Sequence, residues 1–316
     1  MQDNAAMADV VTASLRSLDF DAALSWFTDE GGLRVDSIFP ADAPREASLS
    51  ARGLILQLTA ADRSPAPVSP PTLVVTRAGD QPFGSGRAGM QYRDLVPGRF
   101  GGRYIVSHIR IEQGGPVPDY VHHHDIAFQM IWCLQGWVRV VYEDQGEPML
   151  LEAGDCFLQP PHIRHRVLEC SDMMEVIEIA SPAEHETSVD HDMTLPTGRN
   201  DPEREFGGQR FVFHKAATAD WLTSDIPGME YRNSGIAAAT AGVVSVIALR
   251  STGRAGDIPL RHEGAFHFVF VTAGEAILEG SRMQKGDAIA IPPASDCTLR
   301  SPTDDFECLE VLAPSR

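Results

Sequence analysis

The chain has 316 residues, of which 43% are hydrophobic and 22% are charged, a balance typical of a soluble globular protein with enough apolar material for two domains. Its formal net charge of -18 argues against a nucleic-acid partner, because phosphate backbones are bound mainly by Lys and Arg. The sequence has neither a secretory signal at its start nor the roughly 18 consecutive apolar residues of a membrane helix. We therefore expect a cytoplasmic protein without a membrane partner, whose five cysteines are free thiols.

The first 72 residues differ from the rest of the chain. From Asn4 to Phe27 the apolar residues recur at roughly helical spacing, which predicts a helix that stops near Gly31 and Gly32. Residues 53–60 (GLILQLTA) are typical of a short strand. The stretch ADRSPAPVSPPT that follows is too rich in proline for a helix or a central strand. Residues 1–72 are thus predicted to be an extension with a short helix and an irregular connector.

An internal repeat organises the remaining residues. The stretch GMQYRD at 89–94 recurs as GMEYRN at 228–233. Further matched pairs keep their register, apart from one slip in a hairpin whose length is free to vary: His124 with His262, Phe128 with Phe266, Gly136 with Gly274, Gly154 with Gly286, Asp155 with Asp287 and Pro160 with Pro292. The repeat predicts two domains, 73–182 and 209–316, joined by a linker at 183–208.

Each copy of the repeat consists of short alternating stretches separated by Gly, Pro and Asp. Examples are RYIVSHIRI and MMEVIEIA in the first copy and VVSVIALRS and FECLEVLA in the second. Such segments are typical of β-strands in sandwiches or closed jelly rolls. The pattern predicts an all-β protein.

Histidines cluster in the first copy, which reads PDYVHHHDIAFQMIWCLQG and then GDCFLQPPHIRH. Side chains two residues apart on a strand point to the same face, so His122 and His124 are predicted to face one interior together. His165 would reach the same point from another strand, after the double proline. Three protein ligands with vacant positions are typical of a catalytic metal site, and neutral imidazole suits iron, copper, nickel and zinc.

These two stretches resemble the motifs of the cupin superfamily. The first motif is an H-x-H pair, a carboxylate and a glycine, and the second is G-D, a proline, a turn and a histidine. The matching residues here are His122, His124, Gln129 and Gly136, then Gly154, Asp155, Pro160 and His165. The resemblance implies a bicupin, with two tandem double-stranded β-helix (jelly-roll) barrels. It also implies one divalent transition metal per chain on His122, His124 and His165, with Gln129 as a possible fourth ligand.

The chain departs from this pattern at two places near the predicted metal. Gln129 stands where the motif has a carboxylate, and His162 stands in the turn where a small residue is usual. Gln129 is predicted either to bind the metal or to hydrogen-bond a substrate. His162 is a candidate proton shuttle, although a solvent-facing turn histidine is an equally good interpretation.

The second copy lacks part of the ligand set. Leu260 replaces the first histidine and Cys297 replaces the last, which leaves His262, His267 and Cys297 at ligand positions. Zinc could bind such a set. The apolar run GAFHFVFV beside it favours instead a degenerate barrel that has filled its interior and become a structural partner.

The neutral Gln129 constrains the chemistry. Three imidazoles and an amide leave a divalent ion with its full charge, so the site should attract an anionic bidentate substrate, such as a phenolic, hydroxy-acid or keto-enol compound. This logic favours an Fe(II) dioxygenase, and the architecture resembles that of gentisate-type ring-cleaving dioxygenases. The same histidines on zinc, nickel or manganese would suit an isomerase, lyase or hydrolase. A binding protein without catalysis is the third hypothesis. We also expect a homo-oligomer, such as a dimer.

Overall fold

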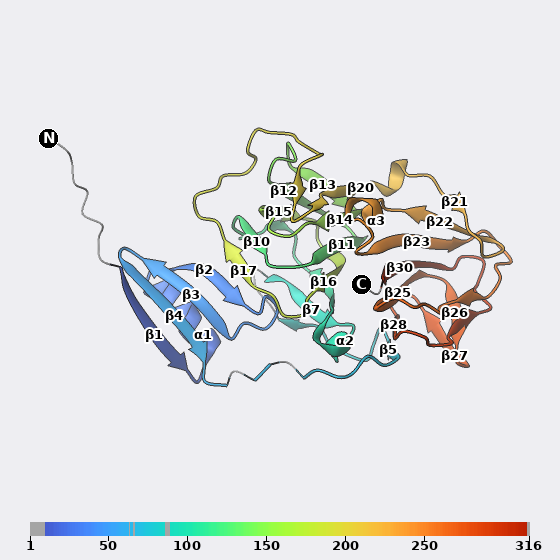
Figure 1. Ribbon diagram of the computed structural model, residues 1–316, viewed down its shortest axis with the longest axis horizontal. Helices are drawn as coiled ribbons and strands as arrows, with labels where there is room; N and C mark the ends of the chain where they lie inside the picture. The colour runs from blue at the N-terminus through green and yellow to red at the C-terminus, as the bar shows by residue number, and fades with distance from the viewer. Residues whose placement is uncertain (1–9, 63, 66, 86–88, 315–316) are drawn as a thin grey trace.

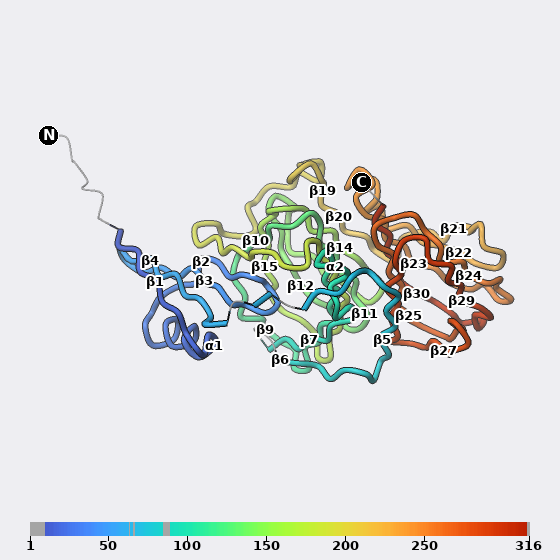
Figure 2. The backbone as a smooth tube through the Cα atoms, turned by 60° about the horizontal axis from the view of Figure 1, so that its bottom comes forward, coloured from blue at the N-terminus to red at the C-terminus, as the bar shows by residue number. Residues whose placement is uncertain are grey.

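The computed structural model describes residues 10–62, 64–65, 67–85 and 89–314, and it is almost entirely β-stranded (Figure 1). An N-terminal unit, a first barrel and a second barrel follow one another along the long axis of the molecule (Figures 1 and 2). The predicted all-β fold with two jelly-roll barrels is confirmed. None of the helices in the described ranges is long and apolar enough to cross a membrane.

The N-terminal unit is a four-stranded sheet with one short helix. Its strands, in spatial order, are β1 (Val11–Ser17), β4 (Leu54–Ala60), β3 (Glu46–Ala51) and β2 (Arg34–Phe39). Helix α1 (Phe20–Ser25) places Phe20 against Leu49 and Leu58, which are fully buried in a small core of their own. The strand predicted at 53–60 is confirmed as β4.

The helix predicted from Asn4 to Phe27 is wrong over much of its length. Val11–Ser17 forms strand β1, which pairs in parallel with β4, and residues 4–9 lie outside the described ranges. Val11, Ala13 and Leu15 also fit an alternating pattern, so pairing with β4 outweighs a weak helical preference. Helix begins only after Asp19, whose carboxylate accepts a hydrogen bond from the Ala22 amide at 3.0 Å. A π-helical turn (η1, Trp26–Glu30) then ends at Gly31, close to the predicted stop.

The first barrel is formed by two facing sheets. One sheet continues the N-terminal unit through β2 and runs through β17 (Thr187–Val189), β10 (His122–His124), β15 (His165–Cys170), β12 (Trp137–Tyr142) and β13 (Met149–Glu152), with β9 (Gly115–Pro116) beside β15. The other contains β20 (Val212–His214), β14 (Cys156–Gln159), β11 (Phe128–Gln135), β16 (Met174–Ser181), β8 (Ile105–Ile111), β7 (Gln91–Asp94) and β6 (Gly84–Ser85).

The second barrel repeats this plan with fewer strands. Its larger sheet contains β21 (Leu222–Thr223), β22 (Met229–Asn233), β23 (Ser245–Ser251), β30 (Glu307–Ala313), β25 (Phe266–Ala273), β28 (Ala288–Ile291) and β5 (Val74–Thr76). Its smaller sheet contains β24 (Ile258–Pro259), β29 (Thr298–Arg300), β26 (Glu275–Leu278) and β27 (Ser281–Gln284). The short elements outside the barrels are α2 (Arg99–Gly102), η3 (Ala216–Thr218), α3 (Ile236–Ala239) and the hairpin of β18 (Glu205–Phe206) with β19 (Gln209–Arg210).

The two copies of the repeat exchange their first strands. Strand β5, at the start of the first copy, pairs with β28 of the second barrel. Strand β20, near the start of the second copy, pairs with β14 of the first barrel. The predicted boundaries at 73 and 209 therefore mark the sequence repeat, whereas one sheet of each barrel takes a strand from the other copy.

The barrels also share the largest hydrophobic core of the molecule. Phe100, Tyr104 and Phe128 of the first copy pack there with Phe266 and Phe268 of the second. The rings of Tyr104 and Phe266 are stacked with centroids 4.2 Å apart. Burying several aromatic side chains contributes roughly 1.5–3 kcal/mol for each. This shared core makes the second barrel a structural support for the first.

Candidate metal centre

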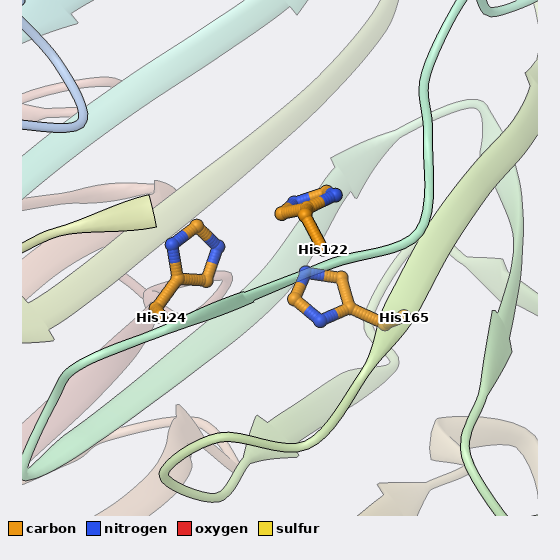
Figure 3. Close-up of side chains that lie close together, drawn as sticks. All are labelled: His122, His124 and His165. Carbon is orange, nitrogen blue, oxygen red and sulfur yellow. The ribbon is translucent and has the colours of Figure 1, made fainter. Parts of the chain in front are cut away.

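Three histidines converge inside the first barrel (Figure 3). His122 and His124 lie two residues apart on β10, and His165 is the direct cross-strand partner of His122 on β15. The ring centroids of His122 and His165 are 4.3 Å apart, and potential ligand nitrogens of all three residues lie within 4.8 Å of one another. Each residue is at most 6% exposed. The structure thus brings together the three residues that the spacing singled out.

Two of these imidazoles are oriented by main-chain carbonyls. Nδ1 of His122 donates to the carbonyl oxygen of Tyr120 at 2.8 Å, and Nδ1 of His165 donates to that of Ile163 at 3.0 Å. In a neutral imidazole, a proton on Nδ1 places the lone pair on Nε2. Metal-binding histidines are commonly fixed in this way by a hydrogen bond on their other nitrogen.

The third imidazole is held by a side chain from outside the repeat. Nδ1 of His124 lies 2.8 Å from the hydroxyl oxygen of Thr187 on β17. Strand β17 pairs with β10 on one side and with β2 of the N-terminal unit on the other. The linker and the N-terminal unit therefore help to orient a candidate ligand.

The three side chains fit one divalent transition ion. Their neutral nitrogens suit iron, copper, nickel or zinc, and three ligands leave coordination positions for a substrate. Within the described ranges, no other group of three or more His, Cys, Asp or Glu side chains is close enough to share an ion.

Gln129 lies in the same interior, paired across the sheet with Gln159 of β14. Both residues line the cavity beside the histidines and are 2% exposed. The carboxamide oxygen of each is buried without a hydrogen-bond partner. The sequence identified Gln129 from its motif position, but Gln159 has no such position. Gln159 faces the cavity because the strand register pairs it with Gln129.

The histidines lie in an interior cavity of about 100 Å³. Most of its wall is apolar and comes from the strands of the first barrel: Ile109, Val138, Val140, Leu151, Phe157 and Met174. Two carboxylate side chains, Asp42 and Glu178, also line it, and none of its described lining residues is Lys or Arg. The described wall therefore offers a bound anion no Lys or Arg side chain, and a metal ion on the three histidines would be its main positive charge.

Tyr142 adds a polar group that the sequence analysis missed. It lines the cavity, is 1% exposed, and its ring stacks on that of His165 with centroids 5.5 Å apart. Burial and, to a lesser degree, the nearby Glu178 carboxylate raise the pKa of the Tyr142 phenol well above its ordinary value. The phenol therefore stays protonated at neutral pH, where it is able to donate a hydrogen bond.

Part of the cavity wall comes from outside the barrel. Asp42 and Ala41, between β2 and β3, line it together with His185 of the linker. The Ala41 amide donates to the His185 carbonyl at 3.0 Å. The His185 ring lies 5.5 Å from that of His124. Burial lowers the pKa of His185.

His162 is not brought into the cavity. Its side chain is 52% exposed, and its Nε2 lies 3.7 Å from the Asp125 carboxylate. Its ring packs near that of His123, on the other face of β10 from the candidate ligands. The solvent-facing interpretation therefore fits the structure, and the proton-shuttle role proposed for His162 has no geometric support.

The second barrel uses its histidines differently. His267 Nδ1 donates to the Leu260 carbonyl at 3.1 Å, and its Nε2 lies 2.6 Å from the Glu310 carboxylate. His262 Nε2 lies 2.9 Å from the Ile291 carbonyl oxygen. Cys297 is buried, and burial raises the pKa of its thiol. Both ring nitrogens of His267 are occupied by protein groups, so these residues do not form a three-ligand site.

Comparisons with known proteins agree with this fold. Residues 107–179 match the cupin domain family. The crystal structure of protein Ylba from E. coli is similar, with 12% identity and a TM-score of 0.57, over 81% of this chain and 96% of that one. A putative glyoxylate-induced protein from Pseudomonas aeruginosa has 13% identity and a TM-score of 0.58, over 81% and 93%.

Oxalate decarboxylase from Bacillus subtilis is also similar, with 11% identity and a TM-score of 0.56, over 78% of this chain and 77% of that one. One structure of that enzyme is described as containing Mn(II) centres. No curated protein sequence matches this chain. At such identities, the similarity establishes the fold alone.

Proposed function

From the premise that the chain folds as two tandem cupin barrels, the first of which matches the cupin domain family, we propose that it is a mononuclear metal-dependent enzyme. His122, His124 and His165 hold one divalent transition metal. The favoured reaction is that of an Fe(II) dioxygenase acting on a small anionic substrate that binds through two oxygens, as phenolic, hydroxy-acid and keto-enol compounds do.

The observation that carries the proposal is the orientation of the three imidazoles. Each Nδ1 is within 3.0 Å of a protein oxygen, and all three rings meet at one cavity. A polar loop would not need three separate hydrogen bonds that direct the opposite nitrogens toward a common point. Such anchoring is expected of ligands that must be preorganised for an ion.

A bound Fe(II) would supply a Lewis acid and a redox centre at which a chelating substrate and dioxygen react. The chain's own residues control access and orientation. The apolar wall excludes water, which strengthens electrostatic interactions inside the barrel. Tyr142 and Gln129 offer hydrogen bonds to a substrate held beside the histidines. No carboxylate occupies the position of Gln129, so the ligand set leaves the full charge of the ion to attract an anionic substrate, although the Asp42 and Glu178 carboxylates also line the cavity.

A second candidate is a manganese- or zinc-dependent lyase, isomerase or hydrolase. The observation that favours it is the structural similarity to an oxalate decarboxylase with Mn(II) centres. The fold alone does not distinguish this candidate from the first.

Oxygen consumption separates these candidates. The protein is purified without oxygen, stripped with a chelator and reloaded with Fe(II), Mn(II) or Zn(II), and an oxygen electrode then follows a panel of phenols, hydroxy acids and diketones. The first candidate, an Fe(II) dioxygenase, should consume one equivalent of oxygen per product formed, and only when the protein is loaded with iron. Turnover with manganese or zinc and without oxygen uptake would contradict the first candidate and support the second. Binding without turnover under any metal would favour a binding protein.

A further inference from the structure

The cavity contains two buried polar atoms that the fold leaves unsatisfied. Gln129 and Gln159 are direct cross-strand partners, and the carboxamide oxygen of each has no hydrogen-bond partner. A buried acceptor without a partner costs roughly 1–3 kcal/mol. Because both residues line the cavity of the candidate metal centre, a ligand bound there is able to supply the missing donors.

The fold itself does not require this pair. The equivalent cross-strand pair of the second barrel is His267 with Ile291. There, the histidine is satisfied by Glu310 and by a main-chain carbonyl, and Ile291 is fully buried and apolar. The same two strand positions can therefore be occupied without leaving the side chains at these positions unsatisfied. At these two strand positions, unpartnered acceptors occur only in the barrel with the three-histidine cluster, although His262 Nδ1 and Thr272 Oγ1 of the second barrel are also buried without a partner.

The electrostatics of the cavity point in the same direction. Asp42 and Glu178 line it, and none of the described lining residues is a cation. Asp42 has an ion-pair partner, Arg99, at 2.5 Å, but Arg99 is not among the lining residues. A dicarboxylate would bring a second negative charge to a wall with no cation to receive it. A ligand with one charge and an O–H or N–H donor meets the two open acceptors instead.

Size and polarity restrict the rest of the ligand. An apolar cavity of about 150 Å³ is known to hold benzene. The interior of about 100 Å³ therefore limits the enclosed part of a ligand to roughly a single ring or a short branched chain. Most of the other lining side chains are apolar, among them Val138, Leu151 and Met174.

We propose that Gln129 and Gln159 form an acceptor pair that selects a small chelating substrate with a hydroxyl or N–H donor and an apolar body, as in a catechol-type phenol, over dicarboxylates. This inference rests on the proposed function, because the substrate is held at the metal of the same site. It assigns Gln159 as a specificity-determining residue. The proposed preference against dicarboxylates would distinguish this site from that of a protein acting on oxalate, despite the shared fold.

Calorimetric titration of zinc-loaded protein tests the selection without any turnover. The probes are catechol and oxalate, which both chelate through two oxygens but differ in donors, charge and apolar area. Each measured affinity is first corrected for the affinity of the same probe for free zinc in solution. The wild type should then bind catechol at least about tenfold more tightly than oxalate, which is the gain expected from one or two satisfied hydrogen bonds. Tighter binding of oxalate would overturn the proposal, and this result needs no variant.

A variant then assigns the effect to the amide. Gln159→Leu should weaken catechol binding by about tenfold and leave oxalate binding and zinc content unchanged. The matched control is Met174→Leu, which changes another cavity-lining side chain without removing a polar group. Equal losses for both probes, or no loss for catechol, would overturn the role of Gln159. A wild type that retains no zinc would refute the proposed function rather than the selectivity.

Discussion

The first and second barrels have the same strand register, and they differ most where their interiors would bind a ligand. His122 pairs with His165 in the first barrel. At the equivalent place in the second, the Leu260 amide donates to the carbonyl of Cys297, and both side chains are buried in an apolar core. The first barrel keeps a cavity of about 100 Å³ lined by polar groups, whereas its partner is packed with leucine, isoleucine and methionine.

The strands around the histidine pair differ as well. In the first barrel, β10 lies between β15 and β17, so Thr187 reaches His124 from the flanking strand. In the described part of the second barrel, β24 is an edge strand beside β29 alone. His262 instead faces the carbonyl of Ile291. The candidate metal centre thus lies in the barrel that has an added strand beside its histidines and an open interior.

The largest expected effect is a loss of stability that differs between the filled interior of the second barrel and the hollow interior of the first. In metal-free protein, Leu299→Ala should cost about 2–5 kcal/mol of unfolding free energy, because Leu299 is fully buried and its removal creates a void. Leu151→Ala in the first barrel should cost roughly 2 kcal/mol or less, because Leu151 already borders a cavity. Urea unfolding of both variants measures the difference. Equal losses would mean that the first interior is as tightly packed as the second.

The next prediction concerns the charge at Gln129. Gln129→Glu should tighten metal binding, because a carboxylate adds a negative charge and a better oxygen ligand. It should weaken binding of a chelating 2-hydroxy acid by about tenfold to a hundredfold, the equivalent of one lost charge-assisted interaction. Metal competition and anion titration give the two constants, with Gln129→Met as the uncharged control. An unchanged or improved anion affinity in Gln129→Glu would contradict the charge argument.

Thr187 offers a test of the added strand. Thr187→Val removes the hydroxyl that contacts His124 and keeps the shape, so metal affinity should fall by about 10–100-fold. Thr187→Ser retains the hydroxyl and should stay close to the wild type. Competition with a chromophoric chelator measures both variants. If valine and serine behaved alike, the hydroxyl would not orient the ligand.

The smallest effect is expected at His162. This residue has a positive φ of 62°, so asparagine is a suitable replacement. Since the His162 side chain is half exposed and outside the cavity, His162→Asn should change metal affinity and turnover by no more than about twofold. A loss of turnover of tenfold or more, with metal affinity preserved, would restore the proton-shuttle interpretation.

The sequence correctly predicted that His122, His124 and His165 converge, because side chains two residues apart on a strand share a face and the second motif brings a third histidine from another strand. Their role as metal ligands stays a prediction. The sequence also found the repeat, since Gly, Pro and Asp turns recur in register. It missed β1, where the apolar residues fit both helical and alternating spacing and only the pairing with β4 decides.

Several cavity residues lay outside the reach of sequence patterns. Gln159 and Tyr142 acquire a role only from their strand register and from what lies opposite. Asp42 and His185 come from segments outside the repeat, and no local motif predicts that they line the same cavity. Contacts between residues so far apart in the sequence depend on the pairing of β2, in the N-terminal unit, with β17.

The central claim, that only the first barrel is a metal centre, is tested most directly by metal content per chain. Elemental analysis after dialysis against a weak chelator should give one ion per chain for the wild type and none for the variant with both His122→Ala and His124→Ala. The matched variant with His262→Ala and His267→Ala, in the second barrel, should retain one ion, provided that its circular dichroism remains native. Metal retained without His122 and His124, or lost without His262 and His267, would contradict the assignment.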